Sequence, residues 1–390
     1  MIVERVRVGD VLRLERRPVD PDPTKEYVSI GVRSFGKGIF HYDPTLGNQL
    51  GKLRFFEVVP ARLVVSNIKG WEGAVAVSTD EDAGCVASNR FLTYVPCDDR
   101  IDVRWARWYF LSDSGLQLIQ QSSPGSADRN RTLAISRFEA LEIPLPSIDE
   151  QQRVANRLQA LEASASKLRR RVEHASLLST ALAVSAVTQP DIAESAKASA
   201  GWRRLRLAEV LTNRNEEVPV QDSASYDIAG VYSFGRGIFR RGPLAGSGTS
   251  YRALHRLRKG QVVMSRLKAW EGAIAVVPAD LDGWYLSPEF PTFDIDMAQV
   301  DVDYFGSLIT SEPFWRSLRG ESRGIGARRE RVHASRLLEQ VVDLPPISIQ
   351  RSIARTLRFL HGAESLRSGA PGRIDALVPA AINEEFAGLS

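Results

Sequence analysis

The chain has 390 residues, 43% of them hydrophobic and 25% charged, which is too long for one ordinary core, so at least two domains are expected. No run approaches the roughly 18 unbroken apolar residues that a membrane helix needs. Residues 1–5 lack the basic and apolar regions of a secretory signal. The two cysteines, Cys85 and Cys97, match no metal or disulfide spacing. We therefore expect a cytoplasmic protein with no membrane partner.

The net charge is +4, and the sequence pI is about 9.1. Arginine outnumbers lysine 43 to 8. Its planar fork suits phosphates and guanine edges, but a GC-rich coding bias explains the excess equally well. Composition therefore permits nucleic-acid binding without establishing it.

The first region, residues 1–148, is rich in short β-type runs such as 62–65 and 74–77, which Gly and Pro interrupt. Pro144 and Pro146 mark its end, and a strongly patterned helix follows. This order predicts a mixed α/β domain that leads directly into a helix.

That helix is predicted over residues 149–190. Residues on one seam recur at alternating steps of four and three, and all but the serine are apolar: Val154, Leu158, Leu161, Ala165, Leu168, Val172, Ala175, Ser179 and Leu182. Such a seam is typical of a coiled coil, although an amphipathic helix lying on a globular core is the alternative. The narrow seam favours the coiled coil. About 39 helical residues would extend about 58 Å at 1.5 Å per residue.

After a small, polar linker at 191–201, the sequence repeats itself. Eight of the ten residues in 31–40 are identical to those in 230–239, at an offset of 199 residues. Eight of the twelve in 66–77 match 265–276 at the same offset. A constant offset across separated blocks identifies a tandem duplication. Residues 202–346 are therefore predicted to be a second copy of the first domain.

The last predicted element is a helix over 347–390, in which Ile353, Leu357 and Leu360 begin the same apolar seam. A Gly-Ala-Pro-Gly run at 369–372 interrupts the helix, which is expected to resume around residue 374. Two helices of matching length are thus available to pair with each other.

Catalytic motifs are missing. None of the five histidines has a histidine at its repeat counterpart, and no HExxH, nucleophile elbow or Walker loop occurs. Glu72 and Glu271 match each other, so a duplicated hydrolase that uses this pair of acids is an alternative. We favour a framework role, in which these glutamates pair with Lys69 and Lys268 or cap a turn, and the preceding tryptophans pack in the core.

Binding chemistry is better represented. Flexible basic stretches occur at matching positions, 125–131 and 323–331. Glycine lets backbone approach a phosphate and arginine contacts phosphates or guanine edges, whereas solvated surface charge is the rival interpretation. The candidate DNA-contacting residues are Arg33, Lys37, Lys69, Arg129, Arg131, Arg137, Arg236, Arg240, Arg266, Lys268, Arg323, Arg328, Arg329 and Arg336.

In these features the chain resembles the specificity (S) subunits of type I restriction-modification systems. The resemblance covers nearly the whole chain and depends on the order recognition domain, helix, recognition domain, helix. Residues 145–155 and 344–354 look like the family's Leu-Pro-x-x-x-x-Gln entry into its spacer helices. Residues 286–290 and 202–211 also look like recurrent blocks of its recognition domains, although the counterpart at 3–12 lacks the tryptophan.

The resemblance implies an α+β fold with two tandem, mixed α/β target recognition domains, at 1–148 and 202–346. The helices at 149–190 and 347–390 would separate the domains and pack as an antiparallel coiled coil with pseudo-two-fold symmetry. The residues expected to pair the helices are Val154, Leu158, Leu161, Leu168, Val172, Leu182, Ile353, Leu357 and Leu360.

The resemblance also implies a function. Each domain would read one half of a bipartite target in double-stranded DNA. Two copies of a methyltransferase (M) subunit would dock along the helices and methylate adenine N6, and a motor-nuclease (R) subunit would join for cleavage. The chain itself would be a non-catalytic, metal-free part of bacterial or archaeal phage defence. S-adenosylmethionine, ATP and Mg are expected only in the partner subunits.

The two recognition domains of this family are usually dissimilar, whereas two blocks are nearly identical here. We therefore expect related half-sites in inverted orientation. Two other functions remain open: a duplicated hydrolase, and a DNA-binding adaptor of another defence system.

Overall fold

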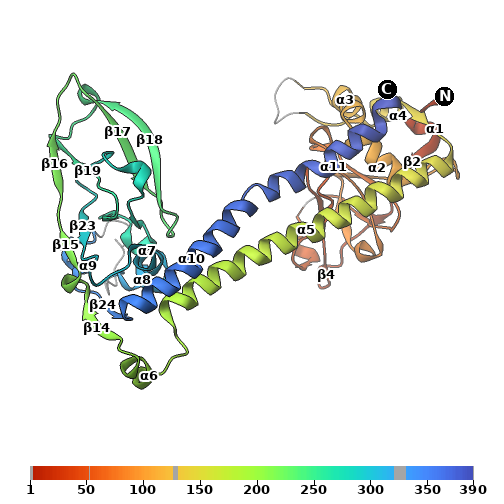
Figure 1. Ribbon diagram of the computed structural model, residues 1–390. Helices are drawn as coiled ribbons and strands as arrows, with labels where there is room; N and C mark the ends of the chain where they lie inside the picture. The colour runs from red at the N-terminus through yellow and green to blue at the C-terminus, as the bar shows by residue number, and fades with distance from the viewer. Residues whose placement is uncertain (1–2, 52, 126–130, 320–330, 390) are drawn as a thin grey trace. The chain divides into compact units, whose positions relative to one another are not determined.

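The computed structural model describes residues 3–51, 53–125, 131–319 and 331–389 (Figure 1). It divides the chain into two compact units, one formed by Met1–Val172 with Gly369–Ser390 and the other by Glu173–Ser368. We call these unit 1 and unit 2. The predicted boundaries at 148 and 346 lie next to the starts of helices, but each compact unit also includes parts of both predicted helices.

Unit 1 begins with a strand that closes onto the last strand before the long helix, since β1 (Glu4–Arg7) pairs antiparallel with β13 (Glu142–Leu145). Its largest sheet has four strands in the order β10-β9-β12-β2, and a three-stranded sheet has the order β11-β8-β3. The two-stranded pairs are β4-β7 and β5-β6. The bounds are β2 Leu12–Leu14, β3 Pro18–Val19, β4 Glu26–Tyr27, β5 Ile30–Val32, β6 Ile39–His41, β7 Thr45–Leu46, β8 Phe55–Glu57, β9 Leu63–Ser66, β10 Val75–Val77, β11 Val86–Ser88 and β12 Phe91–Pro96.

Short helices complete this domain: α1 Val8–Val11, α2 Val103–Leu111, α3 Asp113–Gln121 and α4 Ile135–Glu139. Trp105, Phe110 and Phe138 are fully buried in the same apolar cluster as Leu63 and Leu92 of the four-stranded sheet. Aromatic side chains remove a large apolar area from water, so this helix–sheet interface contributes strongly to the stability of the domain.

Unit 2 repeats this order at the 199-residue offset. The first and last strands of its domain, β14 (Arg203–Arg206) and β24 (Val341–Leu344), pair as β1 and β13 do. A four-stranded sheet has the order β15-β23-β20-β21, and a five-stranded sheet has the order β16-β19-β22-β17-β18. The bounds are β15 Leu211–Asn213, β16 Glu216–Pro219, β17 Ser225–Val231, β18 Ile238–Ala245, β19 Ala253–Arg256, β20 Val262–Met264, β21 Ile274–Val276, β22 Tyr285–Leu286, β23 Thr292–Ile295, α7 Val302–Thr310, α8 Glu312–Ser317 and α9 Ala334–Leu338.

The long helices are α5 (Ile148–Thr188), α10 (Ile347–Arg367) and α11 (Ala370–Phe386). Their starts are fixed by the glutamine of the Leu-Pro-x-x-x-x-Gln block. The Gln151 amide donates to the carbonyls of Arg100 (2.8 Å) and Pro146 (2.9 Å), and its oxygen accepts the backbone N–H of Asp102 (2.9 Å). Gln350 makes the equivalent three bonds at the start of α10. Both side chains are completely buried, so the amide satisfies three backbone groups that water cannot reach.

Within each unit the helices pair antiparallel, as the sequence predicted. In unit 1, α11 runs along the first part of α5, where Arg157 pairs with Glu385 and Arg169 pairs with Asp375 (Figure 1). In unit 2, α10 runs along the last part of α5. There Ser179, the polar member of the predicted seam, accepts a hydrogen bond from Arg367 (2.7 Å).

The predicted seam is wrong at two positions. Leu168 and Leu182 are 45% and 57% exposed, whereas Val187, outside the predicted seam, is 1% exposed. A helix with 3.6 residues per turn drifts by about 20° per heptad from a strict seven-residue repeat. The buried face of α5 has therefore moved from position 182 to 183 and 187 by the end of the helix.

Two connections differ in detail from the expectation. Ser368 and Gly369 separate α10 from α11, and Pro371 already lies in the first turn of α11, where a missing N–H costs little. The linker contains a helix, α6 (Glu194–Ser199), whose Lys197 is buried and pairs with Asp343. No helix in the described ranges is long and apolar enough to cross a membrane.

The end of α11 belongs to the core of unit 1. Phe386 is 2% exposed, and its ring packs edge-on against Trp105 and Tyr109 at centroid distances of 5.8 and 5.6 Å. In unit 2 the corresponding place is held by Val187 of α5, whose carbonyl accepts a hydrogen bond from the buried Tyr304 hydroxyl (3.1 Å). Each domain is thus completed by a helix end that is remote in the sequence.

Replacing Gln151 by Leu should destabilise unit 1 by about 2–4 kcal/mol, because three buried backbone groups lose their partner. Urea unfolding measures this change. The exposed neighbour Gln152 provides the control, since Gln152→Leu should change the free energy of unfolding by less than about 0.5 kcal/mol. Equal effects of the two variants would contradict the anchoring role.

Replacing Phe386 by Ala should cost about 3–5 kcal/mol of unfolding free energy, as expected for a buried phenylalanine. Phe359→Ala is the matched control, because Phe359 is 76% exposed. Thermal unfolding provides the check. If unit 1 of F386A unfolds at the same midpoint temperature as in wild type, α11 is not part of this core.

Candidate nucleic-acid interface

Within each unit, the two sequence blocks that are nearly identical between the copies contact each other: residues 31–40 contact 66–77, and residues 230–239 contact 265–276. The loop between β5 and β6 docks on the Trp-Glu-Gly turn, where the backbone N–H groups of Phe35 and Gly36 donate to the carbonyls of Glu72 and Gly73 (both 2.9 Å). The loop between β17 and β18 docks in the same way, through Phe234 and Gly235 onto Glu271 and Gly272 (2.7 and 3.0 Å). The shared sequence therefore specifies a hairpin tip and the turn that supports it.

Glu72 has the framework role that its sequence predicts. Its carboxylate accepts hydrogen bonds from Lys69 (2.7 Å) and Ser34 (2.8 Å), and the bond from Lys69 holds the pKa of this carboxyl below its ordinary value of 4.5. Glu271 pairs with Lys268 at 3.2 Å. A glutamate held ionised by a lysine is a poor general acid, so the geometry gives no support to the hydrolase alternative.

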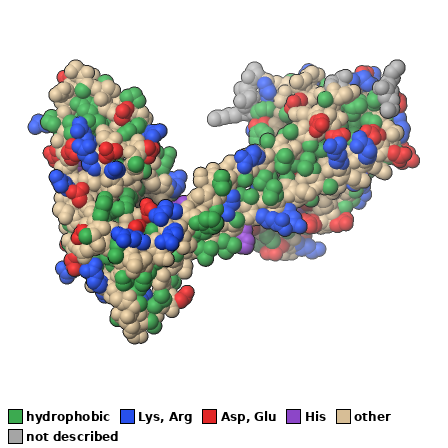
Figure 2. Space-filling model, viewed as in Figure 1, with side chains coloured by type: hydrophobic (Ala, Val, Ile, Leu, Met, Phe, Trp, Pro, Cys, Tyr) green, Lys and Arg blue, Asp and Glu red, His purple; other side chains and the backbone are tan. Residues whose placement is uncertain are grey.

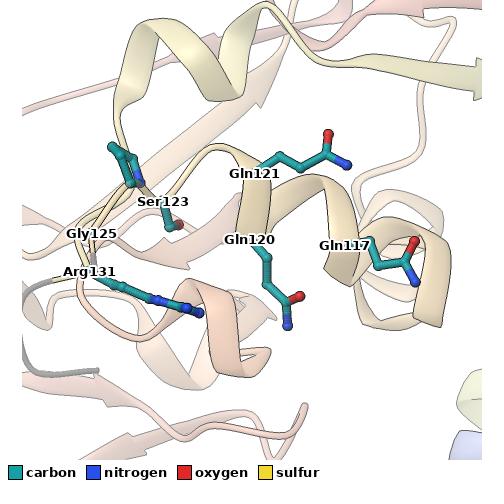
Figure 3. Close-up of a pocket in the computed structure, with 7 residues that line it drawn as sticks. Gln117, Gln120, Gln121, Ser123, Gly125 and Arg131 are labelled. Carbon is teal, nitrogen blue, oxygen red and sulfur yellow. The ribbon is translucent and has the colours of Figure 1, made fainter. Parts of the chain in front are cut away.

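Trp71 is the centre of a basic surface in unit 1. The prediction that it packs in the core is wrong: it is only partly buried, and the charged ends of Lys69 and Arg131 each lie 5.1 Å from its ring centroid. Beside it lies an open pocket of about 430 Å³, lined by Gln117, Gln120, Gln121, Ser123, Pro124, Gly125 and Arg131. Figure 3 shows the glutamines projecting from α3, with Arg131 approaching from the other side. Amides and guanidinium groups here can bond to base edges or phosphates.

Trp270 occupies the same place in unit 2. It is partly buried and packs against the core of that unit, as predicted, and the guanidinium of Arg319 lies 5.3 Å from its ring centroid. A pocket of about 240 Å³ lies beside it, lined by Trp270, Leu318, Arg331, Val332, His333, Ser335, Arg336 and Glu339. Among the described residues, the buried Nε atoms of Arg266 and Arg336 have no hydrogen-bond partner.

The remaining predicted DNA-contacting residues are scattered. Arg33 and Lys37 lie on the hairpin tip of unit 1, and Arg236 lies on that of unit 2. Arg137 is exposed on α4, whereas Arg240 pairs with Asp280 (2.7 Å). Arg129, Arg323, Arg328 and Arg329 lie outside the described residues. Figure 2 shows basic and acidic side chains intermixed on the visible face of unit 2, so charge alone does not delimit an interface.

The candidate set omits several residues of this surface. The glutamines of α3 and Arg319 escaped notice because nothing in the sequence places α3 and α8 beside the tryptophans. Phe35 and Phe234 carried a usable signal, since both are identical between the copies and stand between polar and glycine residues. In the described part of the chain, no group of three or more His, Cys, Asp or Glu side chains could hold a metal ion.

Comparison with known proteins shows what the first domain and the whole fold are similar to. Residues 4–174 match the family model of the type I restriction modification DNA specificity domain. A search of curated proteins finds no match.

Solved structures share the fold of the whole chain. The HsdS subunit from Thermoanaerobacter tengcongensis aligns with a TM-score of 0.56 and 17% identity over 99% of this chain and 97% of that one. A chain from a study of complex assembly and conformational transition of the type I R-M system gives 0.65 and 16%, over 98% and 97%. The S subunit from M. genitalium gives 0.51 and 12%, over 99% and 96%.

The domain of unit 1 is thus similar to DNA specificity domains, and unit 2 repeats its order of elements. Over almost its whole length the chain shares the fold of these solved S subunits, and its residues 4–174 match the DNA specificity domain.

Replacing Glu72 by Gln should lower the stability of unit 1 by about 0.5–1 kcal/mol at pH 7, because the ion pair with Lys69 is lost. The folded-state pKa lies below 4.5, so the ionised carboxylate stabilises the fold above that pH and ceases to do so as the pH falls through the lowered pKa. The difference in the free energy of unfolding between wild type and E72Q, measured by urea unfolding, should therefore become smaller as the pH is lowered. A gap that widens at low pH would contradict this assignment.

Proposed function

We propose that this chain is a non-catalytic subunit that binds a bipartite DNA target and directs adenine methylation and restriction by partner subunits. The observation that carries the proposal is the presence, in one chain, of two specificity-type domains, each with its own tryptophan-centred basic surface. Two such surfaces fit two half-sites. S-adenosylmethionine, ATP and Mg would act in the partners, in a bacterial or archaeal cytoplasm.

The two tryptophan-centred surfaces differ at positions whose side chains could contact DNA bases. Gln117 and Gln120 of unit 1 correspond, at the 199-residue offset, to Arg316 and Arg319 of unit 2. A glutamine amide matches the N6 and N7 edge of adenine, whereas the arginine fork matches O6 and N7 of guanine. We propose that the half-sites are related through the shared framework but differ in the bases that face these positions.

The helices offer apolar surface to the methyltransferase partners. Leu177, Leu178, Phe359 and Leu366 of unit 2 are between 51% and 83% exposed. Figure 2 shows hydrophobic side chains gathered over the helical part of this unit. Clustered exposed apolar side chains mark protein interfaces, which supports docking of an M subunit along the helices, with the R subunit joining the assembly for cleavage.

The experiment is co-expression of the full chain with a type I methyltransferase (M) subunit from the same genome, in a host without adenine methylation, followed by genome-wide mapping of N6-methyladenine. We expect a bipartite motif with one methylated adenine on each strand and with related, inverted half-sites. Gln120→Ala should relax discrimination in one half-site by about tenfold, since one base contact is worth about 1–3 kcal/mol.

Two controls sharpen this test. The methyltransferase expressed alone should leave no motif, and Gln152→Ala, on an exposed face of α5, should leave the motif unchanged. Methylation that does not depend on the chain would overturn the proposal and favour an adaptor of another defence system. A motif with two unrelated half-sites would contradict the expectation of related half-sites but not the proposed function.

A further inference from the structure

Two phenylalanines stand out among the exposed residues. Phe35 and Phe234 are 75% and 62% exposed, and both have a positive backbone φ, of 61° and 64°. They hold equivalent positions at the tips of the β5–β6 and β17–β18 hairpins, 199 residues apart.

The backbone does not favour a phenylalanine here, and both rings keep most of their surface exposed. A bulky side chain at positive φ is a conformational outlier, whereas glycine adopts the same backbone freely. An exposed ring also gains little from the hydrophobic effect. Both copies nevertheless keep the same strained, solvent-facing aromatic residue, which indicates a partner outside the domain.

The tips are held in place. Besides the two backbone bonds to the Trp-Glu-Gly turn, the carbonyl of Gly36 accepts a hydrogen bond from Arg107 (2.9 Å). Arg107 is only 11% exposed and also pairs with Glu162 of α5 (2.7 Å). In unit 2, Phe234 instead packs edge-on against Trp315 of α8, at 6.2 Å between ring centroids. A ring presented on a rigid tip loses little entropy on binding.

The surroundings of the rings suit DNA. A cation follows two residues later in both copies, as Lys37 and as Arg236, so the charge is retained although the residue changes. A side chain at Gly38 or Gly237 would meet open space, which leaves room for a phosphate backbone to approach. Lys69 and Lys268 lie on the supporting turns.

We propose that Phe35 and Phe234 are wedges that insert against the base stack, one in each half-site, while the neighbouring cation contacts a phosphate. This inference depends on the proposed function. It adds one contact, the stacking of a phenylalanine ring on a base, that both half-sites would share. Stacking on a base face is tolerant of sequence, which explains why the ring is identical in two domains whose pocket residues differ.

The test measures binding of the full chain, co-purified with its methyltransferase, to a duplex that carries the mapped target. Phe35→Gly should weaken binding by about 5- to 100-fold, the range expected for loss of one stacked base. The salt dependence of the affinity should stay unchanged because no phosphate contact is lost. The thermal midpoint should equal or exceed that of wild type, since glycine relieves the positive φ.

Three matched variants complete the design. Phe35→Tyr keeps a ring and should bind within about twofold of wild type. Lys37→Ala, on the same tip, should instead reduce the slope of log affinity against log salt by about one. Tyr42→Ala removes another exposed aromatic at the opposite end of this hairpin and should leave affinity unchanged. Phe234→Gly should reproduce the effect of F35G through the other half-site.

Each remaining outcome is decisive. An F35G variant that binds DNA like wild type overturns the wedge. A variant that loses the methyltransferase on purification but keeps its DNA affinity overturns it too, and assigns the ring to a protein interface. A wild-type complex that fails to bind the target refutes the proposed function itself, so the two failures are distinguishable.

Discussion

Each domain buries the end of a long helix that does not start from that domain. The rest of this molecule depends on this constraint. Phe386 completes the aromatic core of unit 1, and Val187 completes that of unit 2. Each unit needs one helix that starts from its own domain and another that arrives from elsewhere in the sequence. Neither domain therefore has a complete core without that second helix. This arrangement also explains why the compact units divide the chain near residues 172 and 369 rather than at the ends of the domains.

The candidate interface inherits its rigidity from this packing. In unit 1, Arg107 joins the hairpin tip to Glu162 on α5, and Gln120 of α3 donates to the carbonyl of Trp71 (3.3 Å). In unit 2 the matching positions hold Gly306 and His361 in place of Arg107 and Glu162. The framework of the two surfaces is therefore shared, whereas the side chains that brace and line them are not. One scaffold can present two different sets of contacts in this way.

Several sequence inferences were confirmed because they depend on local rules. The duplication predicted equivalent elements, and β1, α2, α4 and β13 indeed recur as β14, α7, α9 and β24 at the same offset. The predicted pairing of Glu72 with Lys69 joins two residues that are only three apart in the sequence. The heptad seam failed at Leu182 because a strict repeat ignores the drift of a straight helix. Trp270 does pack against the core of unit 2, whereas Trp71 was wrongly assigned to the core because the sequence does not show which aromatic face a cation covers.

The sequence by itself determined the duplication, the Pro-marked starts of the long helices and the match between the two hairpin blocks, since these are properties of spacing and residue type. Only the tertiary structure decided what those blocks do. It brought residues 35 and 72 into contact, placed Arg131 and α3 beside Trp71, and left two phenylalanines exposed on strained tips. Such contacts join segments tens of residues apart, and they follow from how the whole core packs rather than from any local pattern.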